Sequence, residues 1–551
     1  MSKISRRRPP INSEQAQVSS VRENILLRNQ IPTIWPGDVE KLLVAFSEKS
    51  AAKPSGETLD LTKVPFVTID GKDARDFDDA VYCREDAAGF KLDVAVADVS
   101  RYVERDGPLD LAARERGNSV YLPGRVVPML PEMLSTDLCS LNPGEVRFAL
   151  VCRMNLTHDG KIDHYEFVEA RIQSAARLTY DTVSAFLNQP DSAFLDQTSS
   201  VKQSLRTLDV VSRKLWDQRR ARGSLQLEFS ETETLFDHDG YIEAMKLRPR
   251  PEAARVIEEC MLAANICAGQ ALDRSLSKAI YRCHDAPDRD AIRNLKDIFG
   301  VFGVRIDGGS VPTGGVLSRA LASAKKNKKP LACLQMLVLR SMKQAFYSPT
   351  RSAHYGLGFE TYTHFTSPIR RYPDLIAHRL LKAVLDKEPM PGAGYDEREL
   401  TAITDHCSRT ERQAEVAERE MMTWLKAQFM HEYIGNVFLG TVSGVAGFGV
   451  FITLEEFPVE GMIHVSELGW GYFEFDQRHM SLVARETGER VMLGDRIRVK
   501  LAGVHLEDGK IDFARVLDDG FPPKPPRSRK RNRSRQNQAR RKRAAASGRR
   551  H

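Results

Sequence analysis

The chain has 551 residues, of which 42% are hydrophobic and 28% are charged, a composition that excludes a wholly disordered or a membrane-embedded protein. No apolar run approaches the roughly 20 residues that a bilayer-spanning helix needs. The net charge of +7 comes from the C-terminus: Phe521–His551 holds 13 Lys or Arg and no Asp or Glu, so the rest has 68 basic against 74 acidic residues. This length predicts a large body with one or two smaller modules.

The N-terminal segment, residues 1–55, is predicted to be a polar lead-in with short amphipathic helices, for example at Val39–Phe46. The basic run Arg6–Arg8 is not followed by the apolar stretch of a secretion signal, so we expect a cytoplasmic protein with no membrane association. The eight cysteines form no C-x-x-C pair, which favours buried thiols in a reducing compartment over disulfides or a zinc site.

The next segments alternate in type along the chain. Apolar, β-branched residues predict a strand at 64–69 that runs into a polar loop from Asp70 to Asp79, followed by strands at 80–82 and 92–99. Apolar residues at helical spacing then predict helices at 253–272, 331–347, 375–385 and 403–433. Strands first and helices later indicate an α+β domain.

The C-terminal part changes character again. Short β-rich segments punctuated by glycine predict a small separate barrel at 435–517. Four prolines in Phe521–Pro526 indicate a linker to a disordered basic tail, whose expected partner is a polyanion. The alternative is a solvated tail that only aids solubility or mimics a localisation signal.

Five aspartates lie within the loop that follows the first strand: Asp70, Asp73, Asp76, Asp78 and Asp79. Crowded carboxylates repel one another unless cations lie among them, and oxygen ligands without His or Cys favour Mg²⁺ or Mn²⁺. The spacing differs from that of an EF-hand calcium loop. The alternative is an acidic surface loop neutralised by Lys72, Arg75 and solvent.

Hydrolysis of a phosphodiester by two metal ions would explain such a loop. One ion lowers the pKa of a bound water, and the second stabilises the leaving 3′ oxygen. An arginine from elsewhere in the chain is then expected to balance the charge on the phosphate.

Two long motifs carry a family resemblance. The segment Thr68–Val81 resembles the signature loop of the RNB catalytic domain, which is found in the RNase II and RNase R family of 3′→5′ exoribonucleases. The segment His364–Leu375 is similar to the second hallmark of this family. Shorter motifs that also fit are Asn118–Pro123, Pro128–Pro131, Leu138–Leu141 and Arg177–Tyr180. The resemblance covers roughly residues 25–516.

The resemblance implies roles for individual residues at the metal site. The magnesium ligands would be Asp70, Asp76, Asp78 and Asp79, with Asp73 as a bystander. The catalytic residues would be Asp78, the most rate-critical, together with Asp79 and Arg370, which stabilises the transition state. Arg371 would be a neighbouring RNA contact. Structural ion pairs are the alternative role for both arginines.

The resemblance also implies contacts with RNA inside the body. Tyr121 would stack on the terminal nucleotides and Tyr180 would contact a ribose, since a phenol can sense the 2′-hydroxyl. Leu227 occupies the position of the family's second stacking phenylalanine, so Phe229, expected on the same face of a strand, is a candidate substitute. Glu418, on a predicted helix, matches a glutamate that faces the RNA, although a solvated role is the alternative.

The segment after residue 435 resembles an S1-type OB barrel, with Phe448, Phe451 and His464 as expected exposed stacking residues. Filling of the barrel core is the alternative for one or two of them. The predicted organisation is an α+β RNB domain at 56–434, the barrel at 435–517 and a tail at 521–551. The two N-terminal cold-shock barrels typical of RNase R do not fit before Asp70, which suggests a naturally short or a shortened form.

The barrel and the basic tail favour the RNase R branch of the family. The resemblance implies a processive, monomeric 3′→5′ exoribonuclease of RNA turnover and quality control. It would degrade single-stranded RNA, and structured RNA with a 3′ overhang, to nucleoside 5′-monophosphates. The tail is a candidate contact for the ribosome or RNA-decay factors. The competing hypotheses are a non-catalytic RNA-binding scaffold and a metal-dependent DNA nuclease or phosphoesterase.

Overall fold

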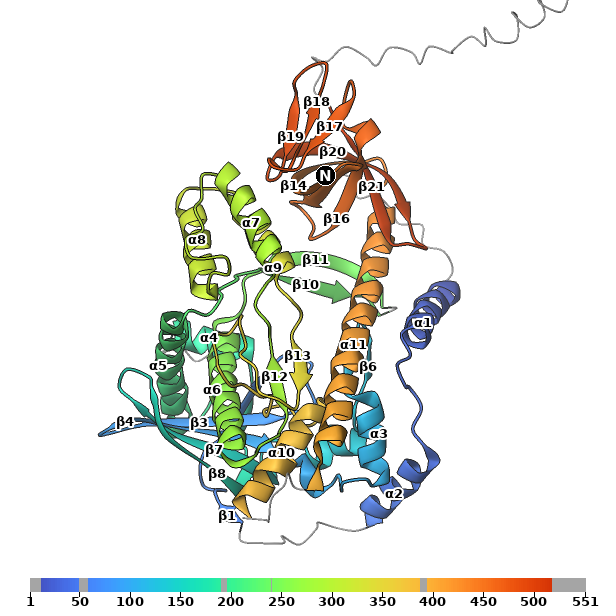
Figure 1. The fold of residues 1–551 in the computed structure, drawn as a ribbon. Helices are drawn as coiled ribbons and strands as arrows, with labels where there is room; N and C mark the ends of the chain where they lie inside the picture. The colour runs from blue at the N-terminus through green and yellow to red at the C-terminus, as the bar shows by residue number, and fades with distance from the viewer. Residues whose placement is uncertain (1–10, 49–57, 190–195, 239, 387–393, 518–551) are drawn as a thin grey trace, which may run out of the picture.

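The computed structural model describes residues 11–48, 58–189, 196–238, 240–386 and 394–517. Figure 1 shows a body of sheet and helices below, a barrel above, and one long helix, α11 (Glu397–His431), running from the body to the barrel. None of the helices in these ranges is long and apolar enough to cross a membrane. The predicted tail at 521–551 lies outside the described residues.

A seven-stranded mixed sheet with the order β1-β8-β7-β4-β3-β2-β9 forms the base of the body. Its strands are β1 (Leu59–Asp60), β2 (Val67–Asp70), β3 (Asp79–Asp86), β4 (Gly89–Ala97), β7 (Val146–Thr157), β8 (Ile162–Gln173) and β9 (Ala176–Thr179). Strand β2 pairs antiparallel with β3 and parallel with β9. The strands predicted at 64–69, 80–82 and 92–99 correspond to β2, β3 and β4. The ends of β2, β3 and β9 are therefore neighbours.

Helices cover one face of this sheet (Figure 1). They are α4 (Tyr180–Asn188), α5 (Ser199–Arg222), α6 (Glu252–Ser275) and α10 (Tyr372–Leu385). The buried side of α6 consists mainly of small residues such as Ala253, Cys260 and Ala264, which allow the helix to lie close to the strands. Gly269 lies against the loop that precedes α10, since a Cβ there would lie 3.2 Å from the backbone nitrogen of Thr363.

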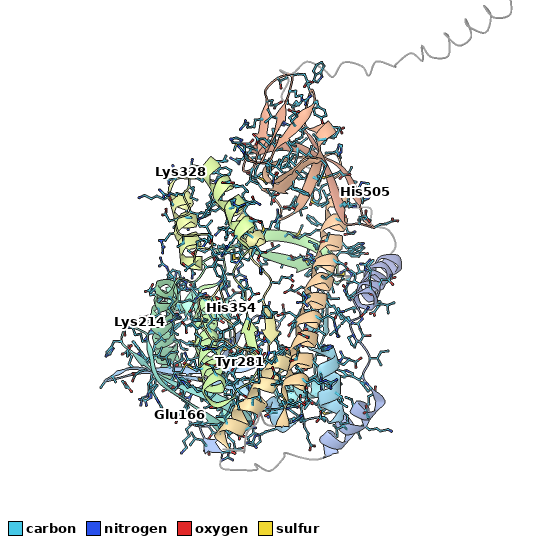
Figure 2. The ribbon with its side chains drawn as sticks, viewed as in Figure 1. Glu166, Lys214, Tyr281, Lys328, His354 and His505 are labelled. Carbon is cyan, nitrogen blue, oxygen red and sulfur yellow. The ribbon has the colours of Figure 1, made fainter. Side chains whose placement is uncertain are left out.

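Shorter elements surround this core. They are η1 (Val99–Arg101), α3 (Pro108–Arg116), β5 (Val120–Leu122), β6 (Arg125–Val127), η2 (Met133–Leu138), β10 (Glu231–Phe236), β11 (Ile242–Arg248), β12 (Tyr281–Cys283), α7 (Arg289–Val301), α8 (Gly314–Lys326), α9 (Leu331–Ser341) and β13 (Phe346–Ser348). In Figure 2, Tyr281 marks β12 inside the body, and Lys328 marks the end of α8 at its upper edge.

The helix predicted at 331–347 is wrong in its second half. Helix α9 ends at Ser341, because Met342 adopts an extended backbone with φ −77° and ψ 150°. Strand β13 follows and pairs with β12, and its Tyr347 donates its backbone N–H to Ser408 Oγ at 2.9 Å. Pairing with a distant strand thus replaces the helix that local spacing predicts.

The N-terminal segment is more ordered than the predicted lead-in of short helices. Helix α1 (Ile11–Arg28) has 18 residues and is followed by α2 (Gly37–Glu48), which matches the helix predicted at 39–46. Val18, Ile25 and Leu26 of α1 are buried in the same apolar cluster as residues of α11 and the barrel. This segment therefore packs against the rest of the chain.

The C-terminal module is a closed five-stranded barrel with the order β14-β15-β16-β21-β20. Its strands are β14 (Val437–Ala446), β15 (Gly449–Leu454), β16 (Glu460–His464), β20 (Arg496–His505) and β21 (Lys510–Arg515). Gly449 is required at a close approach, since a Cβ there would lie 2.2 Å from Ile463 O. Between β16 and β20 the chain forms η4 (Val465–Glu467) and a three-stranded sheet of β17 (Phe473–Asp476), β18 (Ser481–Ala484) and β19 (Arg490–Met492).

The structure confirms the predicted fold class, an α+β body followed by a small barrel. All eight cysteines lie in the described residues, and they are unpaired and buried, as the sequence suggests. The barrel core and Trp424 and Leu425 of α11 belong to one apolar cluster. The barrel is therefore anchored to the body through a continuous helix.

Candidate active site

The aspartate loop connects two neighbouring strands at the edge where β9 also ends. Asp70 is the last residue of β2 and Asp79 is the first residue of β3. Asp78 is buried, Asp70, Asp76 and Asp79 are half-buried, and Asp73 is exposed. The loop thus turns four carboxylates inward and leaves Asp73 in solvent, the division that the sequence analysis expects.

Hydrogen bonds from other segments hold the backbone of the loop. Phe77 donates its N–H to Ser140 Oγ at 3.0 Å, and that hydroxyl donates to Arg75 O at 3.1 Å. From β9, Arg177 Nη2 donates to Lys72 O at 2.5 Å and to Ala74 O at 3.2 Å. These contacts fix the loop conformation through its carbonyl and amide groups.

Asp78 is the most deeply buried carboxylate of the loop. Ile369 donates its backbone N–H to Oδ1 at 2.8 Å, and Arg370 Nε lies 3.4 Å from Oδ2. Oδ2 itself is buried and has no hydrogen-bond partner. Burial raises the pKa of Asp78 well above its usual value, against the lowering effects of Arg370 and the Ile369 N–H. An acceptor that is held only by this 3.4 Å ion pair would be stabilised further by a closer cation.

Asp70 and Asp79 repel each other across the strand ends. Burial raises the pKa of Asp70 to about 6, and Asp76 adds to the rise. Burial and the charge of Asp70 raise the pKa of Asp79 to about 8. Arg370 lowers the pKa of both carboxyls, but it does not cancel these effects. Burial and the neighbouring carboxylates thus favour the protonated forms of Asp70 and Asp79, and a cation beside them would stabilise the ionised forms.

Arg370 reaches the loop from a distant part of the sequence, just before α10. Its backbone carbonyl accepts the Ser119 N–H at 2.9 Å, and its Nη2 donates to Ser367 Oγ at 3.0 Å. The side chain remains 44% exposed, so the guanidinium can meet a ligand while it faces Asp78. Geometry thus joins the two long sequence motifs at one site.

Arg371 has a different environment from its neighbour. Its Nη2 donates to Asp374 Oδ1 at 2.8 Å, and Asp374 is fully buried at the start of α10. Burial lowers the pKa of the Arg371 guanidinium, but the nearby Asp374 raises it, and the net effect is an increase. The described contacts match the alternative structural role and do not show Arg371 facing a ligand.

Three predicted RNA contacts lie around the loop. Tyr121, on β5, donates its hydroxyl to Asp76 Oδ2 at 3.0 Å, and its backbone N–H donates to Glu418 Oε1 at 3.1 Å. Tyr180 opens α4 directly after Thr179, the residue paired with Asp70 across β2 and β9. Burial, Asp70 and Asp79 raise the pKa of Tyr180. Both phenols therefore border the carboxylates, and Glu418 positions Tyr121.

The predicted strand at Phe229 is wrong. Residues 224–230 are irregular, because their backbone bonds go to a loop and a helix: Leu225 donates to Gly356 O at 2.8 Å, and Gln226 donates to Ser318 Oγ at 2.7 Å. Phe229 is 39% exposed, whereas Leu227 is half-buried against an apolar cluster. The structure gives no contact between either residue and the aspartate loop.

The barrel presents its predicted aromatic residues at the surface. Phe448 and His464 are exposed, Phe451 is half-buried, and none of the three belongs to the barrel core. Gly449 pairs with His464, and the Phe448 and Phe451 rings meet edge-to-face with centroids 6.1 Å apart. We name Phe448, Phe451 and His464 the aromatic face of the barrel.

Sequence reasoning assigned no role to the residues that brace the loop. Ser140 lies in the motif Leu138–Leu141 and Arg177 in the motif Arg177–Tyr180. Ser119, whose N–H binds the Arg370 carbonyl, lies in the motif Asn118–Pro123. Their partners are backbone atoms, which carry no signature in a sequence. The only available signal was their presence in motifs that had no other explanation.

The donor set fits a hard divalent cation. Among the described residues, no group of three or more His, Cys, Asp or Glu side chains is close enough together to hold a metal ion. The four carboxylates therefore do not form a closed cage in this conformation. Mg²⁺, however, commonly takes one or two carboxylates and completes its shell with substrate phosphate and water. The Asp78 Oδ2 atom, which accepts no hydrogen bond, and the raised pKa values of Asp70 and Asp79 agree with such an open site.

Comparisons with known proteins agree with this geometry. Residues 58–387 match the RNB domain, and residues 433–515 match the S1 RNA binding domain. Ribonuclease R of Escherichia coli is 40% identical over 509 residues, which cover 91% of this chain and 62% of that protein. The chain thus spans less than two thirds of the length of this relative.

Solved structures show the same arrangement of body and barrel. Mycoplasma genitalium RNase R in complex with ribose methylated single-stranded RNA superposes with a TM-score of 0.85 at 30% identity, covering 91% of this chain and 78% of the other. The same protein in complex with double-stranded RNA gives a TM-score of 0.79 at 29% identity, covering 91% and 83%.

Proposed function

Because the chain belongs to the RNB family, to which the ribonucleases R also belong, we propose that it is a divalent-metal-dependent exoribonuclease. It would hydrolyse single-stranded RNA processively from the 3′ end and release nucleoside 5′-monophosphates. The observation that carries this proposal is the meeting of Asp78 and Arg370, from two distant motifs, at one acidic loop. Hydrolysis of a phosphodiester needs two groups at one place: a carboxylate that binds a cation, and a positive charge that faces the phosphate.

Magnesium is the proposed cofactor, with Mn²⁺ as the alternative. Asp70, Asp76, Asp78 and Asp79 would hold it. When bound, such ions lower the pKa of a water and neutralise charge on the phosphate. The support from this chain is the crowding of half-buried carboxylates, which raises the pKa of Asp79, and the Oδ2 atom of Asp78, which accepts no hydrogen bond.

The protein groups would bind and orient the RNA. The partly exposed guanidinium of Arg370 would hold a phosphate oxygen, since its planar fork matches the geometry of a phosphate. Tyr121 would stack on a base, because its phenol is fixed by Asp76 and its backbone by Glu418. Tyr180 would contact a ribose and favour RNA over DNA.

The buried site also suggests how structured RNA is handled. Asp78 is only 5% exposed, so a single strand should reach it more readily than a rigid duplex. We therefore propose that structured RNA is degraded when it carries a single-stranded 3′ overhang. The aromatic face of the barrel would hold the strand above the site. RNA turnover and quality control are the corresponding cellular role.

We propose a monomer that works in the cytoplasm, a reducing compartment in which eight unpaired thiols are expected. The basic segment Phe521–His551, outside the described residues, would contribute contacts to RNA, the ribosome or decay factors. Deleting it should weaken RNA binding and flatten the dependence of affinity on salt, because its 13 Lys or Arg release counterions from RNA. Binding titrations at several salt concentrations measure this, and an unchanged slope would exclude the role.

One experiment separates the proposed function from its rivals. Single-stranded RNA labelled at either the 5′ or the 3′ end is incubated with the protein in Mg²⁺ or in EDTA, with single-stranded DNA in parallel. Metal-dependent release of mononucleotides from 3′-labelled RNA, with a shrinking 5′-labelled strand, is the expected result. Binding without hydrolysis would support a scaffold, and equal cleavage of DNA would support a less selective nuclease.

A further inference from the structure

The aromatic face of the barrel has a neighbour on the extra sheet β17–β19. This sheet packs on the barrel through its inner side, where Phe473, Leu482 and Val491 are buried in the barrel's own apolar cluster. The sheet is therefore a fixed part of the module. In Figure 1 it lies at the end of the barrel that is farther from the body.

Alternation along β17 divides two exposed aromatic residues between opposite faces. Phe473 points into the core, so Phe475, two residues on, lies on the same face, where it is 39% exposed at the edge of the barrel. Tyr472, one residue before Phe473, belongs to the opposite face and is 63% exposed. Only Phe475 is therefore directed toward the barrel surface.

Phe475 lies beside the turn that carries Phe448. Ala446 pairs with Gly449, so Gly447 and Phe448 form the turn between β14 and β15. A Cβ on Gly447 would lie 3.8 Å from Phe475 Cβ, which is van der Waals contact. Phe448, the next residue, is 54% exposed and packs edge-to-face on Phe451. Phe475 thus lies next to the turn whose Phe448 packs on Phe451.

We propose that Phe475 is an additional stacking site for single-stranded RNA, which extends the aromatic face of the barrel onto the β17–β19 sheet. Exposed phenyl rings in a row are costly in water, and on OB barrels such rows hold successive bases by stacking without reading their sequence. Continuity with Phe448 and Phe451 makes RNA the occupant.

The position of Phe475 also sets which nucleotides it meets. The sheet lies beyond the barrel as seen from the body, so a strand whose 3′ end is in the active site reaches Phe475 with nucleotides far from that end. Short RNAs that fill only the body should not contact it. This inference rests on the proposed function, because it assumes that RNA runs from the barrel to the aspartate loop.

The test measures binding in EDTA, which prevents hydrolysis, by fluorescence anisotropy with RNAs of about 30 and about 6 nucleotides. Phe475→Ala should raise the dissociation constant for the long RNA about fivefold and leave that for the short RNA unchanged. Tyr472→Ala, which removes a more exposed aromatic residue on the opposite face, is the control and should bind both RNAs like the unmodified chain.

A second variant separates stacking from packing. Phe475→Leu keeps apolar volume against Gly447 but removes the ring, so it should melt at the same temperature as the unmodified chain and still bind the long RNA more weakly. Unchanged long-RNA binding by both Phe475 variants, or equal weakening by Tyr472→Ala, would overturn the inference. Absence of RNA binding by the unmodified chain would instead count against the proposed function.

Discussion

The aspartate loop and the aromatic face of the barrel differ in how far the chain fixes them before RNA arrives. The loop is braced through its backbone by Ser140 and Arg177, and its buried Asp78 already faces Arg370. Phe448 and His464, by contrast, lie at the surface of a turn and a strand end. The first region suits a reaction whose rate falls when the reacting groups are displaced. The second suits stacking contacts that RNA of many sequences can make.

This contrast predicts that substitutions in the loop act on the rate and that substitutions on the barrel act on binding. Asp78→Asn should have the largest effect, a loss of about a thousandfold in mononucleotide release, since a buried cation ligand is removed. RNA binding in EDTA should be unchanged or tighter, because one negative charge is lost. Asp73→Asn, in the exposed part of the loop, is the control and should retain the full rate.

The second expected effect concerns the shape of the guanidinium. Arg370→Lys keeps the positive charge but loses the planar fork, and it should lower the rate at saturating RNA about a hundredfold. Single-turnover rates with a 5′-labelled RNA measure this loss. Arg75→Lys makes the same exchange at an exposed position of the loop and should leave the rate intact. If both variants lose activity equally, a general loss of arginine contacts would explain the result.

The bracing of the loop predicts a smaller effect. Ser140→Ala removes the hydroxyl shared by Phe77 and Arg75, so the loop should shift and the rate should fall about tenfold, with a loss of about 1 kcal/mol in the free energy of unfolding. Ser135→Ala removes another buried hydroxyl, which donates to Pro131 O in the neighbouring turn. It should cost similar stability without the loss of rate, as denaturation curves and rates together would show.

A substitution on the barrel is expected to have the smallest effect, and this effect should be on RNA binding and not on the rate. Phe448→Ala should weaken RNA binding about fivefold through lost stacking, and the rate at saturating RNA should not change. Val437→Ala, at another exposed apolar position of the barrel, is the control for loss of surface area alone. A fall in the saturated rate of Phe448→Ala would break the division between the two regions.

Some of this site was predictable from the sequence and some was not. The four inward carboxylates were predicted, because strand and loop patterns are local and the motif resemblance identified their partner in Arg370. The bracing by Ser140 and Arg177 was not, because it acts through the carbonyls and amides of other residues. The pairing of Arg371 with Asp374 was not predicted either, and its predicted contact with RNA stays a prediction. Neighbours in sequence at the start of a helix point in different directions.

Prediction of the fold from the sequence also failed where contacts between distant segments decide the structure. The amphipathic helices α6, α10 and α11 were predicted from strong apolar spacing. Helix α1 was not predicted at its length, because only Val18, Ile25 and Leu26 among its described side chains are buried, too sparse a pattern to define a helical face. At residues 342–348 and 224–230, partners distant in sequence decide the backbone conformation, and local patterns gave the wrong structure.

Helix α11 connects the two regions with a single rigid element. It has 35 residues, about 50 Å of continuous helix. One of its residues, Glu418, fixes Tyr121 beside the carboxylates, and its C-terminal turns are anchored in the barrel core. If RNA runs from the barrel to the aspartate loop as proposed, this helix sets how many nucleotides separate the scissile bond from the barrel. An RNA shorter than that span is held at one end only, so the length at which degradation slows is a property of this helix.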